Sequence, residues 1–207
     1  MPILALDTAS MVSSVAVATA GKLLAELTVQ TRLTHSETLM PHIQQVLSMA
    51  DVKKEDLEGI AVSIGPGSFT GLRIGLATAK SMAYALQLPL IGVSTLQALA
   101  WHFPVPGIYT AALLDAQKGN AYMAVYEWES GCLQEKEAVT VCSLQEAVAH
   151  CAALERPVML TGDIVQKKLT KLSDLPGNLQ IASPHMLMPR AANVAMQGLQ
   201  DFAEGKV

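Results

Sequence analysis

The amino-acid sequence predicts an α/β fold made of two related subdomains, of which the second is truncated. Three observations support this prediction. The order strand, strand, strand, helix, strand, helix occurs twice, the first strand of each copy ends in an aspartate (Asp7 and Asp115), and proline and glycine cluster at residues 101–107. Such a cluster is typical of a connection between domains. We therefore expect one subdomain at residues 1–103 and a smaller one at residues 104–207.

The first copy opens with a meander of strands and continues with two helices. Apolar patterning predicts strands at residues 3–6, 12–18, 22–29 and 60–64. Thr34 and Glu37 have the spacing of a capping box, and apolar residues then recur with helical period. A second helix follows the last strand and reaches about residue 87.

The second copy repeats this order but is cut short. We expect strands at residues 108–114, 121–128, 133–141 and 158–161. Ser143 is placed to cap a helix, and Gly162 takes the place that Gly65 holds in the first copy. Helical patterns follow near residues 164–172 and 191–203.

Composition limits the classes of function. Hydrophobic residues make up 51% of the chain and charged residues only 15%, so part of the surface is expected to be covered in a complex. The net charge of −4 argues against a free-standing nucleic-acid binder. Three cysteines without paired spacing, and no basic-then-apolar leader, predict a cytoplasmic protein. Proline and polar residues interrupt the uncharged stretch 81–114, so we expect no membrane span there.

The glycine-rich turn at residues 65–71 joins a strand to a long helix, where α/β proteins often bind phosphate. It is not a P-loop, because Leu72 and Arg73 follow Gly71 where lysine and serine or threonine are required. It also has Thr70 in place of the third glycine of a dinucleotide-binding turn. Ser68 is expected to cap the helix rather than act as a nucleophile.

The long helix carries a strip of small residues at four-residue intervals, which places them on one side: Gly71, Gly75, Ala79 and Ala83. Two glycines within a helix cost about 1 kcal/mol each against alanine, so a close backbone contact is expected. The strip either seats the helix on its own sheet or contacts a partner subunit. By itself it favours the internal contact slightly.

Two aspartates at matched strand ends, near glycine turns, resemble the layout of the actin-like (ASKHA, ribonuclease H-like) superfamily. That resemblance implies a nucleotide site with phosphates and magnesium near Asp7, Thr8, Gly65, Gly67 and Asp115. The alternative is that Asp7 and Asp115 cap their own turns. Both turns lack the glycines usual in the superfamily's phosphate loops, and the two interpretations stay open.

More specific motifs resemble the TsaB (YeaZ) family. The matching segments are residues 3–9, 35–37 with Leu39, Pro41 and Ile43, the glycine block 65–75, Pro89 with residues 91–96, and residues 115–116. The resemblance implies a non-catalytic subunit of the bacterial machinery that makes threonylcarbamoyladenosine beside the tRNA anticodon. It further implies TsaD and TsaE as partners, a homodimer when alone, and contact with tRNA only through the complex.

The same resemblance implies that the two helices of the first half form the partner interface. The implied interface residues are His35, Leu39, Ile43, Gly71, Leu72, Gly75, Ala79 and Ala83. On this interpretation Gly75→Leu is expected to abolish TsaD binding and leave the fold intact.

The related subunit TsaD carries a His-x-x-x-His metal motif beyond the shared glycine turn. Aligned without a gap, its two ligand positions fall on Thr95 and Leu99, which cannot hold a transition metal. We therefore expect no metal and no catalytic residue. The alternative is a stand-alone ATP-binding or metallopeptidase-like enzyme, with ATP and magnesium as its cofactors.

Overall fold

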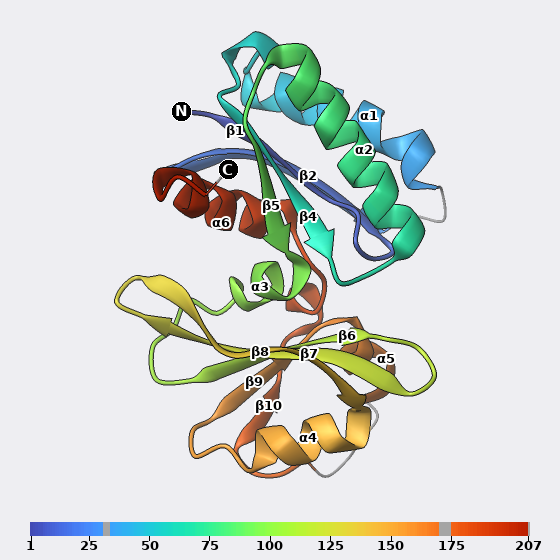
Figure 1. The fold of residues 1–207 in the computed structure, drawn as a ribbon, viewed down its shortest axis with the longest axis vertical. Helices are drawn as coiled ribbons and strands as arrows, with labels where there is room; N and C mark the ends of the chain where they lie inside the picture. Colours follow the sequence, from blue (N-terminus) through green and yellow to red (C-terminus); the bar gives the residue numbers. More distant parts are fainter. Residues whose placement is uncertain (31–33, 170–174, 207) are drawn as a thin grey trace. The chain divides into compact units, whose positions relative to one another are not determined.

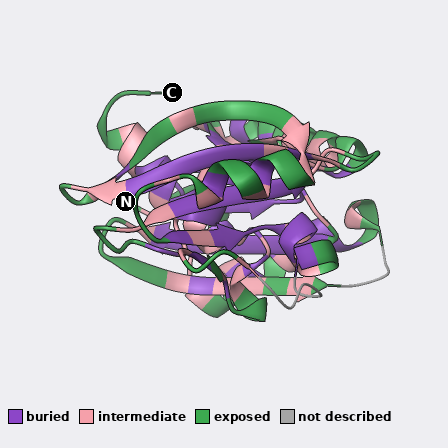
Figure 2. Ribbon diagram, turned by 90° about the horizontal axis from the view of Figure 1, so that it is seen from below, coloured by how far each residue is buried: buried purple, intermediate pink, exposed green. Residues whose placement is uncertain are grey.

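A computed structural model describes residues 1–30, 34–169 and 175–206. The chain forms two compact units, which are described separately. Unit 1 contains residues 1–98 and 189–207, and unit 2 contains residues 99–188. Figure 2 shows that the central strands are mostly buried, whereas exposed residues lie on edge strands, helices and loops.

Unit 1 is built on a five-stranded mixed sheet with the order β3-β2-β1-β4-β5. Strands β1, β2 and β3 pair antiparallel, and β1, β4 and β5 pair parallel. This confirms the predicted opening meander of three strands. The bounds are β1 Ile3–Asp7, β2 Val12–Thr19, β3 Lys22–Gln30, β4 Gly59–Gly65 and β5 Leu90–Ser94.

Helices cover both faces of this sheet (Figure 1). On one face lie α1 (His35–Ala50) and α2 (Phe69–Leu86), and on the other lies α6 (Ala191–Ala203). Successive residues of β1 point to opposite faces. Leu4 and Leu6 pack in the core under α1 and α2, whereas Ile3 and Ala5 pack in the core under α6. The backbone N–H of Thr34 donates to Glu37 Oε2 at 3.0 Å, so the predicted capping box is present.

The position of α6 corrects the sequence-based boundary. Residues 104–207 were assigned to the second subdomain, but residues 189–207 belong to unit 1. The Arg190 guanidinium pairs with Glu26 on β3, and the N–H of Ala191 donates to Ser14 Oγ on β2 at 2.9 Å. The apolar face of the first sheet needs a cover, and the segment that supplies it lies last in the sequence.

Unit 2 repeats the sheet of unit 1 with the order β10-β9-β6-β7-β8. Strand β6 pairs antiparallel with β7 and parallel with β9, as β1 does with β2 and β4. The bounds are β6 Tyr109–Asp115, β7 Asn120–Glu129, β8 Cys132–Ser143, β9 Val158–Thr161, β10 Leu179–Ile181, α4 Leu144–Ala152 and α5 Asp163–Lys168. The described residues also form two short 3-10 helices, η1 Lys54–Asp56 in unit 1 and η3 Pro184–Met186 in unit 2.

The helices of unit 2 are shorter than those of unit 1, whereas its first three strands are longer. Its helix α5 has 6 residues, against 18 in the corresponding α2. The predicted end of this helix falls on residues 170–174, outside the described residues. Strand β10 was not predicted from the sequence; it pairs with β9 and completes the sheet.

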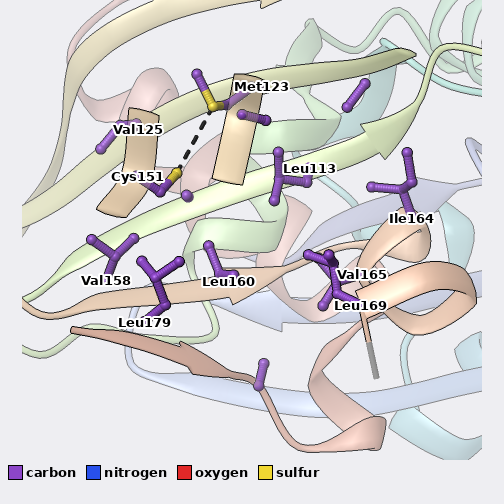
Figure 3. Close-up of a cluster of buried hydrophobic side chains, with 14 of the residues drawn as sticks. Leu113, Met123, Val125, Cys151, Val158, Leu160, Ile164, Val165, Leu169 and Leu179 are labelled. Carbon is purple, nitrogen blue, oxygen red and sulfur yellow. Dashed lines mark hydrogen bonds between the residues drawn. The ribbon is translucent and has the colours of Figure 1, made fainter. Parts of the chain in front are cut away.

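A single apolar cluster fills unit 2 between its sheet and its helices (Figure 3). Leu113, Met123 and Val125 of the sheet and Ile164 and Val165 of α5 all belong to this cluster. The Cys151 thiol lies in this cluster, 3.9 Å from the sulfur of Met123, and burial raises its pKa to about 12. Because the neutral thiol predominates at physiological pH, it packs as a small apolar group.

The uncharged stretch 81–114 folds as several short elements in succession. It forms the end of α2, then β5, helix α3 (Thr95–Ala100) and most of β6. Within residues 1–30, 34–169 and 175–206, no helix combines the length and apolarity that crossing a bilayer requires.

The packing of α6 on the first sheet predicts the effect of Gly198→Ala. In a helix this change normally stabilises by about 1 kcal/mol. Here the added methyl would lie 2.7 Å from Cβ of Ala61 on β4. We therefore expect a net loss of about 1–3 kcal/mol in the free energy of unfolding, measured by denaturant titration. Gly21→Ala, which has open space around it, serves as the control, and stabilisation by Gly198→Ala would contradict the packing.

Candidate functional site

The turn between β1 and β2 packs directly against the glycine turn and the start of α2. The N–H of Ser68 donates to the carbonyl oxygen of Ala9 at 2.7 Å, and Thr8 Oγ1 donates to the carbonyl oxygen of Gly71 at 2.8 Å. Ser68 Oγ accepts from the N–H of Gly71 at 3.2 Å, so Ser68 caps α2 as predicted. A side chain at Gly67 would overlap the carbonyl group of Ala9. The backbone of the β1–β2 turn thus occupies the space beside the glycine turn.

The strip of small residues on α2 faces this contact and not the surface. A Cβ atom at Gly71 would overlap the carbonyl oxygen of Thr8, and one at Gly75 would overlap Thr8 Oγ1. Ala79 and Ala83 are buried in the core between α2 and the sheet. The prediction that this strip is exposed to a partner is therefore wrong, and the internal alternative is correct. The reason is the close approach of the β1–β2 turn, which leaves no room for side chains.

The other residues of the implied interface are also mostly internal. Leu39 and Ile43 on α1 are buried in the same core as Ala79. His35 is half-buried, and its Nε2 lies 2.9 Å from the carbonyl oxygen of Ser10, which ties the start of α1 to the β1–β2 turn. Leu72 is half-buried next to Gly65. These side chains contact the core or the turns on the inner side of the two helices.

Asp7 is fully buried at the end of β1. Burial raises the pKa of its carboxyl to about 6, against smaller opposing effects of the Ser63 hydroxyl, the Ala9 N–H and His35. The Ser63 hydroxyl donates to one carboxyl oxygen, and the N–H of Ala9 donates to the other at 3.2 Å. The carboxyl therefore caps its own turn, as the alternative interpretation predicted.

Asp115 has the same role in unit 2. Its Oδ1 accepts from the N–H of Gln117 at 2.8 Å, two residues ahead, as in the turn after Asp7. The ammonium group of Lys167 lies 3.4 Å from Asp115 Oδ2 and 2.6 Å from Asp163 Oδ2. Lys167 thus offsets part of the negative charge of Asp115 and Asp163. These contacts account for both aspartates without a nucleotide.

Thr95 and Leu99 lie on α3 and are both fully buried. Leu99 presents only hydrocarbon, and the Thr95 hydroxyl oxygen has no hydrogen-bond partner among the described residues. Across residues 1–30, 34–169 and 175–206, His, Cys, Asp and Glu side chains do not gather in threes at metal-binding distance.

The outer face of α1 and α2 has an open hollow of about 410 Å³. It is lined by Met40 of α1 and by Ala77, Thr78, Ser81, Met82 and Ala85 of α2. We call it the α1/α2 groove. The groove was not predicted from the sequence, although Ala77, Ser81 and Ala85 form a second row of small residues at four-residue intervals.

Large side chains are exposed beside the α1/α2 groove. The exposed fractions are 46% for Met40, 67% for Phe69 and 89% for Tyr84. Exposed apolar surface around a hollow is typical of a protein–protein interface. The groove is therefore the best candidate for a binding site on unit 1.

Comparisons with known proteins place the chain among related sequences. A family model described as TsaD, tRNA N6-adenosine threonylcarbamoyltransferase, matches residues 28–198. The Escherichia coli (strain K12) tRNA threonylcarbamoyladenosine biosynthesis protein TsaB is 33% identical over 216 residues, which cover 100% of this chain and 89% of that protein. The Bacillus subtilis (strain 168) protein of the same name is 29% identical over 98% of this chain and 89% of that protein.

A solved structure also matches this chain. The crystal structure of a Pseudomonas aeruginosa protein with similarity to the peptidase YeaZ matches with a TM-score of 0.82 and 27% identity, over 99% of this chain and 93% of that chain. Together with the doubled sheet, this match confirms the predicted fold class of two actin-like subdomains.

The buried carboxyl of Asp7 predicts a pH-dependent stability. Its pKa is about 6 in the folded state and 3.8 ordinarily, so the protonated form favours folding. Its contribution is complete below about pH 4 and is lost as the pH rises through 6, by about 3 kcal/mol in total. Asp7→Asn should flatten the dependence of the free energy of unfolding on pH between about 4 and 7, measured by urea titration.

Ser63→Ala provides the matched comparison. It removes the hydroxyl that lowers the pKa of Asp7, so the loss of stability should extend to higher pH. An unchanged pH profile for both variants would contradict the assigned burial of the charge.

The contact between Gly75 and Thr8 predicts a double-mutant result. Gly75→Ala should lower the free energy of unfolding by about 1–3 kcal/mol, because its methyl overlaps Thr8 Oγ1. In a Thr8→Ala background the same change should cost less, since the hydroxyl is gone. Equal losses in both backgrounds, measured by thermal and urea unfolding, would refute the contact. For the same reason Gly75→Leu is expected to disturb the fold, contrary to the expectation from the sequence.

Proposed function

The chain belongs to the TsaB (YeaZ) family, and from this premise we propose that it is a non-catalytic subunit that binds and supports TsaD. In this proposal TsaD, with TsaE, transfers the threonylcarbamoyl group to the adenosine beside the tRNA anticodon. The pathway is the one that appears in the names of the curated relatives.

The observation that carries the proposal is the α1/α2 groove. Small side chains on α2 and the flexible thioethers of Met40 and Met82 provide a surface that can accept a partner helix. The inner side of α2 is rigidly supported, because Gly71 and Gly75 let the helix pack closely against the β1–β2 turn. We propose that the α1/α2 groove, and not the buried strip of small residues, is the surface that binds TsaD, or a second copy of this chain when the chain is alone.

Two features support a role without catalysis. Thr95 and Leu99 stand at the positions aligned with the metal-binding histidines of TsaD, and leucine has no donor atom. The glycine turn is occupied by the β1–β2 turn, since Ser68 N–H is bonded to the Ala9 carbonyl oxygen. The stand-alone ATP-binding or metallopeptidase-like enzyme is the weaker candidate.

The remaining partners follow from the same proposal. We propose that the chain works in the cytoplasm with no membrane contact and reaches tRNA only through the complex. The net charge of −4 supports indirect contact with tRNA.

A reconstituted reaction tests the subunit role. The mixture contains tRNA, the threonylcarbamoyl donor, TsaD and TsaE, with or without this chain, and modified adenosine is measured. We expect modification to fall to background without the chain. Undiminished modification would refute an essential role, and tight stoichiometric binding of Mg-ATP or zinc by the isolated chain, measured by calorimetry, would favour the enzyme alternative.

The groove is tested by Ala85→Gln, which places a polar side chain in an apolar hollow without harming helix propensity. We expect TsaD binding to weaken by about tenfold or more, because a buried amide would lack partners. Ala149→Gln makes the same change on exposed α4 in unit 2 and should bind normally. Equal affinities for both variants would place the interface elsewhere.

A further inference from the structure

Two histidines on α1 connect this helix to the β1–β2 turn and the start of β2. His35 and His42 are seven residues apart, which places them two turns apart on one side of the helix. His35 Nε2 lies 2.9 Å from the carbonyl oxygen of Ser10, and His42 Nδ1 lies 3.0 Å from Ser13 Oγ. Both rings are partly buried. We call these two contacts the histidine attachment.

The hydrogen-bond partner of His35 determines where the hydrogen of its neutral ring lies. A carbonyl oxygen only accepts, so Nε2 carries the hydrogen that it donates to Ser10. The other ring nitrogen, Nδ1, is buried and has no hydrogen-bond partner among the described residues. A second proton would have to bind at Nδ1, where it would form a buried N–H donor without an acceptor. The contact with Ser10 therefore suits the neutral ring.

His42 has the same tautomer for a different reason. The Ser13 side chain is fully buried, and His42 Nδ1 provides an acceptor for its hydroxyl hydrogen. The hydrogen of the neutral ring then lies on Nε2. A proton at Nδ1 would convert this acceptor into a donor, and the Ser13 hydroxyl would lose its acceptor. Burial lowers the pKa of His42, and the charge of His35 lowers it further.

The elements packed against α1 provide few charges that could compensate a protonated ring. Strand β2 has no ionisable side chain. The ionisable residues on α2, on β3, in the β1–β2 turn and elsewhere on α1 are Arg73, Lys80, Tyr84, Lys22, Glu26, Asp7 and Glu37. Glu26 pairs with Arg190 of α6, and Glu37 accepts from the N–H of Thr34. Asp7 is the carboxyl group that interacts with His35.

We propose that the histidine attachment is a proton-sensitive contact, which releases α1 from the β1–β2 turn when both rings are protonated. His35 would then bury a donor without a partner, Ser13 would lose its acceptor, and the two positive rings would repel each other. Because α1 contributes Met40 to the α1/α2 groove, its release would change the groove. This last step rests on the proposed function, in which the groove binds TsaD.

Acid is expected to loosen α1 and not the whole of unit 1. The pKa of His42 is lowered from its ordinary value of 6.5. Its contribution to the attachment is therefore present above pH 6.5 and is lost as the pH falls below that value. Asp7 acts in the opposite direction, because its raised pKa favours the folded state at low pH. A loss of protection that is confined to α1 on acidification separates the two effects.

Amide hydrogen exchange at about pH 7.5 and about pH 5.5 tests the proposal. Protection factors, which correct for the chemical exchange rate at each pH, are compared between α1 and α2. In the parent chain we expect those of α1 to fall about three- to tenfold relative to α2 at the lower pH. An imidazole with an ordinary pKa of 6.5 that is not protonated in the contact contributes up to about tenfold there.

A variant that keeps both hydrogen bonds but cannot titrate is the matched comparison. His35→Gln places an amide N–H near the position of Nε2, and His42→Asn places an oxygen near that of Nδ1. The double variant should show no fall in the protection of α1. His150→Gln on α4 is the control, because His150 pairs with Glu137 in unit 2, and it should retain the parent response. Equal falls in the parent and the double variant, or constant protection of α1 in the parent, would overturn the proposal.

Nitrogen-15 chemical shifts of the parent chain provide a test that needs no variant. At about pH 8 both rings should be neutral with their hydrogen on Nε2, as the contacts with Ser10 and Ser13 require. An Nδ1–H tautomer in either ring would also overturn the proposal.

Binding to TsaD distinguishes this inference from the proposed function. We expect acidification to weaken TsaD binding by the parent about three- to tenfold more than binding by the double variant, a comparison that cancels titration of TsaD itself. Equal weakening would refute control of the groove by the histidine attachment. A parent chain that binds TsaD at neither pH, although its α1 loses protection as expected, would refute the proposed function and leave the attachment standing.

Discussion

The close packing of the β1–β2 turn on the start of α2 is the contact on which unit 1 depends. Thr8 and Ala9 come so near the helix that only glycine fits at Gly67, Gly71 and Gly75. Two hydrogen bonds lock the approach, from Ser68 N–H to Ala9 and from Thr8 Oγ1 to Gly71. The carboxyl of Asp7, at the start of this turn, is buried, and burial raises its pKa. The space beside the glycine turn is filled by the protein's own backbone.

This packing determines which side of α2 is available to a partner. Because the residues with the least bulk are turned inward, the opposite side of the helix carries its exposed residues. That side presents Ala77, Ser81 and Ala85 along the groove, and Tyr84 is exposed on the same helix. The internal contact thus provides a rigid support, and the outer side a surface with apolar character. The proposed binding role needs such a combination.

Much of the fold could be predicted from the sequence, because local patterns specify it. Alternating apolar residues indicate the strands, and the capping residues Thr34 and Ser143 precede the two predicted helices. The repeated order of elements also predicts that Asp7 and Asp115 take matched places at the ends of β1 and β6. Strand β10 was missed, since its three residues are too few to show a period.

The sequence by itself determined the family, the doubled α/β plan and the capping role of Ser68, and it left both interpretations of the strand-end aspartates open. It left open whether the strip from Gly71 to Ala83 faces inward, because small residues at helical spacing fit a sheet or a partner equally well. Only the tertiary structure decided this, by bringing Thr8 against α2 from 63 residues away in the chain. It also decided that α6 closes the first sheet and not the second. Both outcomes depend on contacts between distant segments, which no local periodicity encodes.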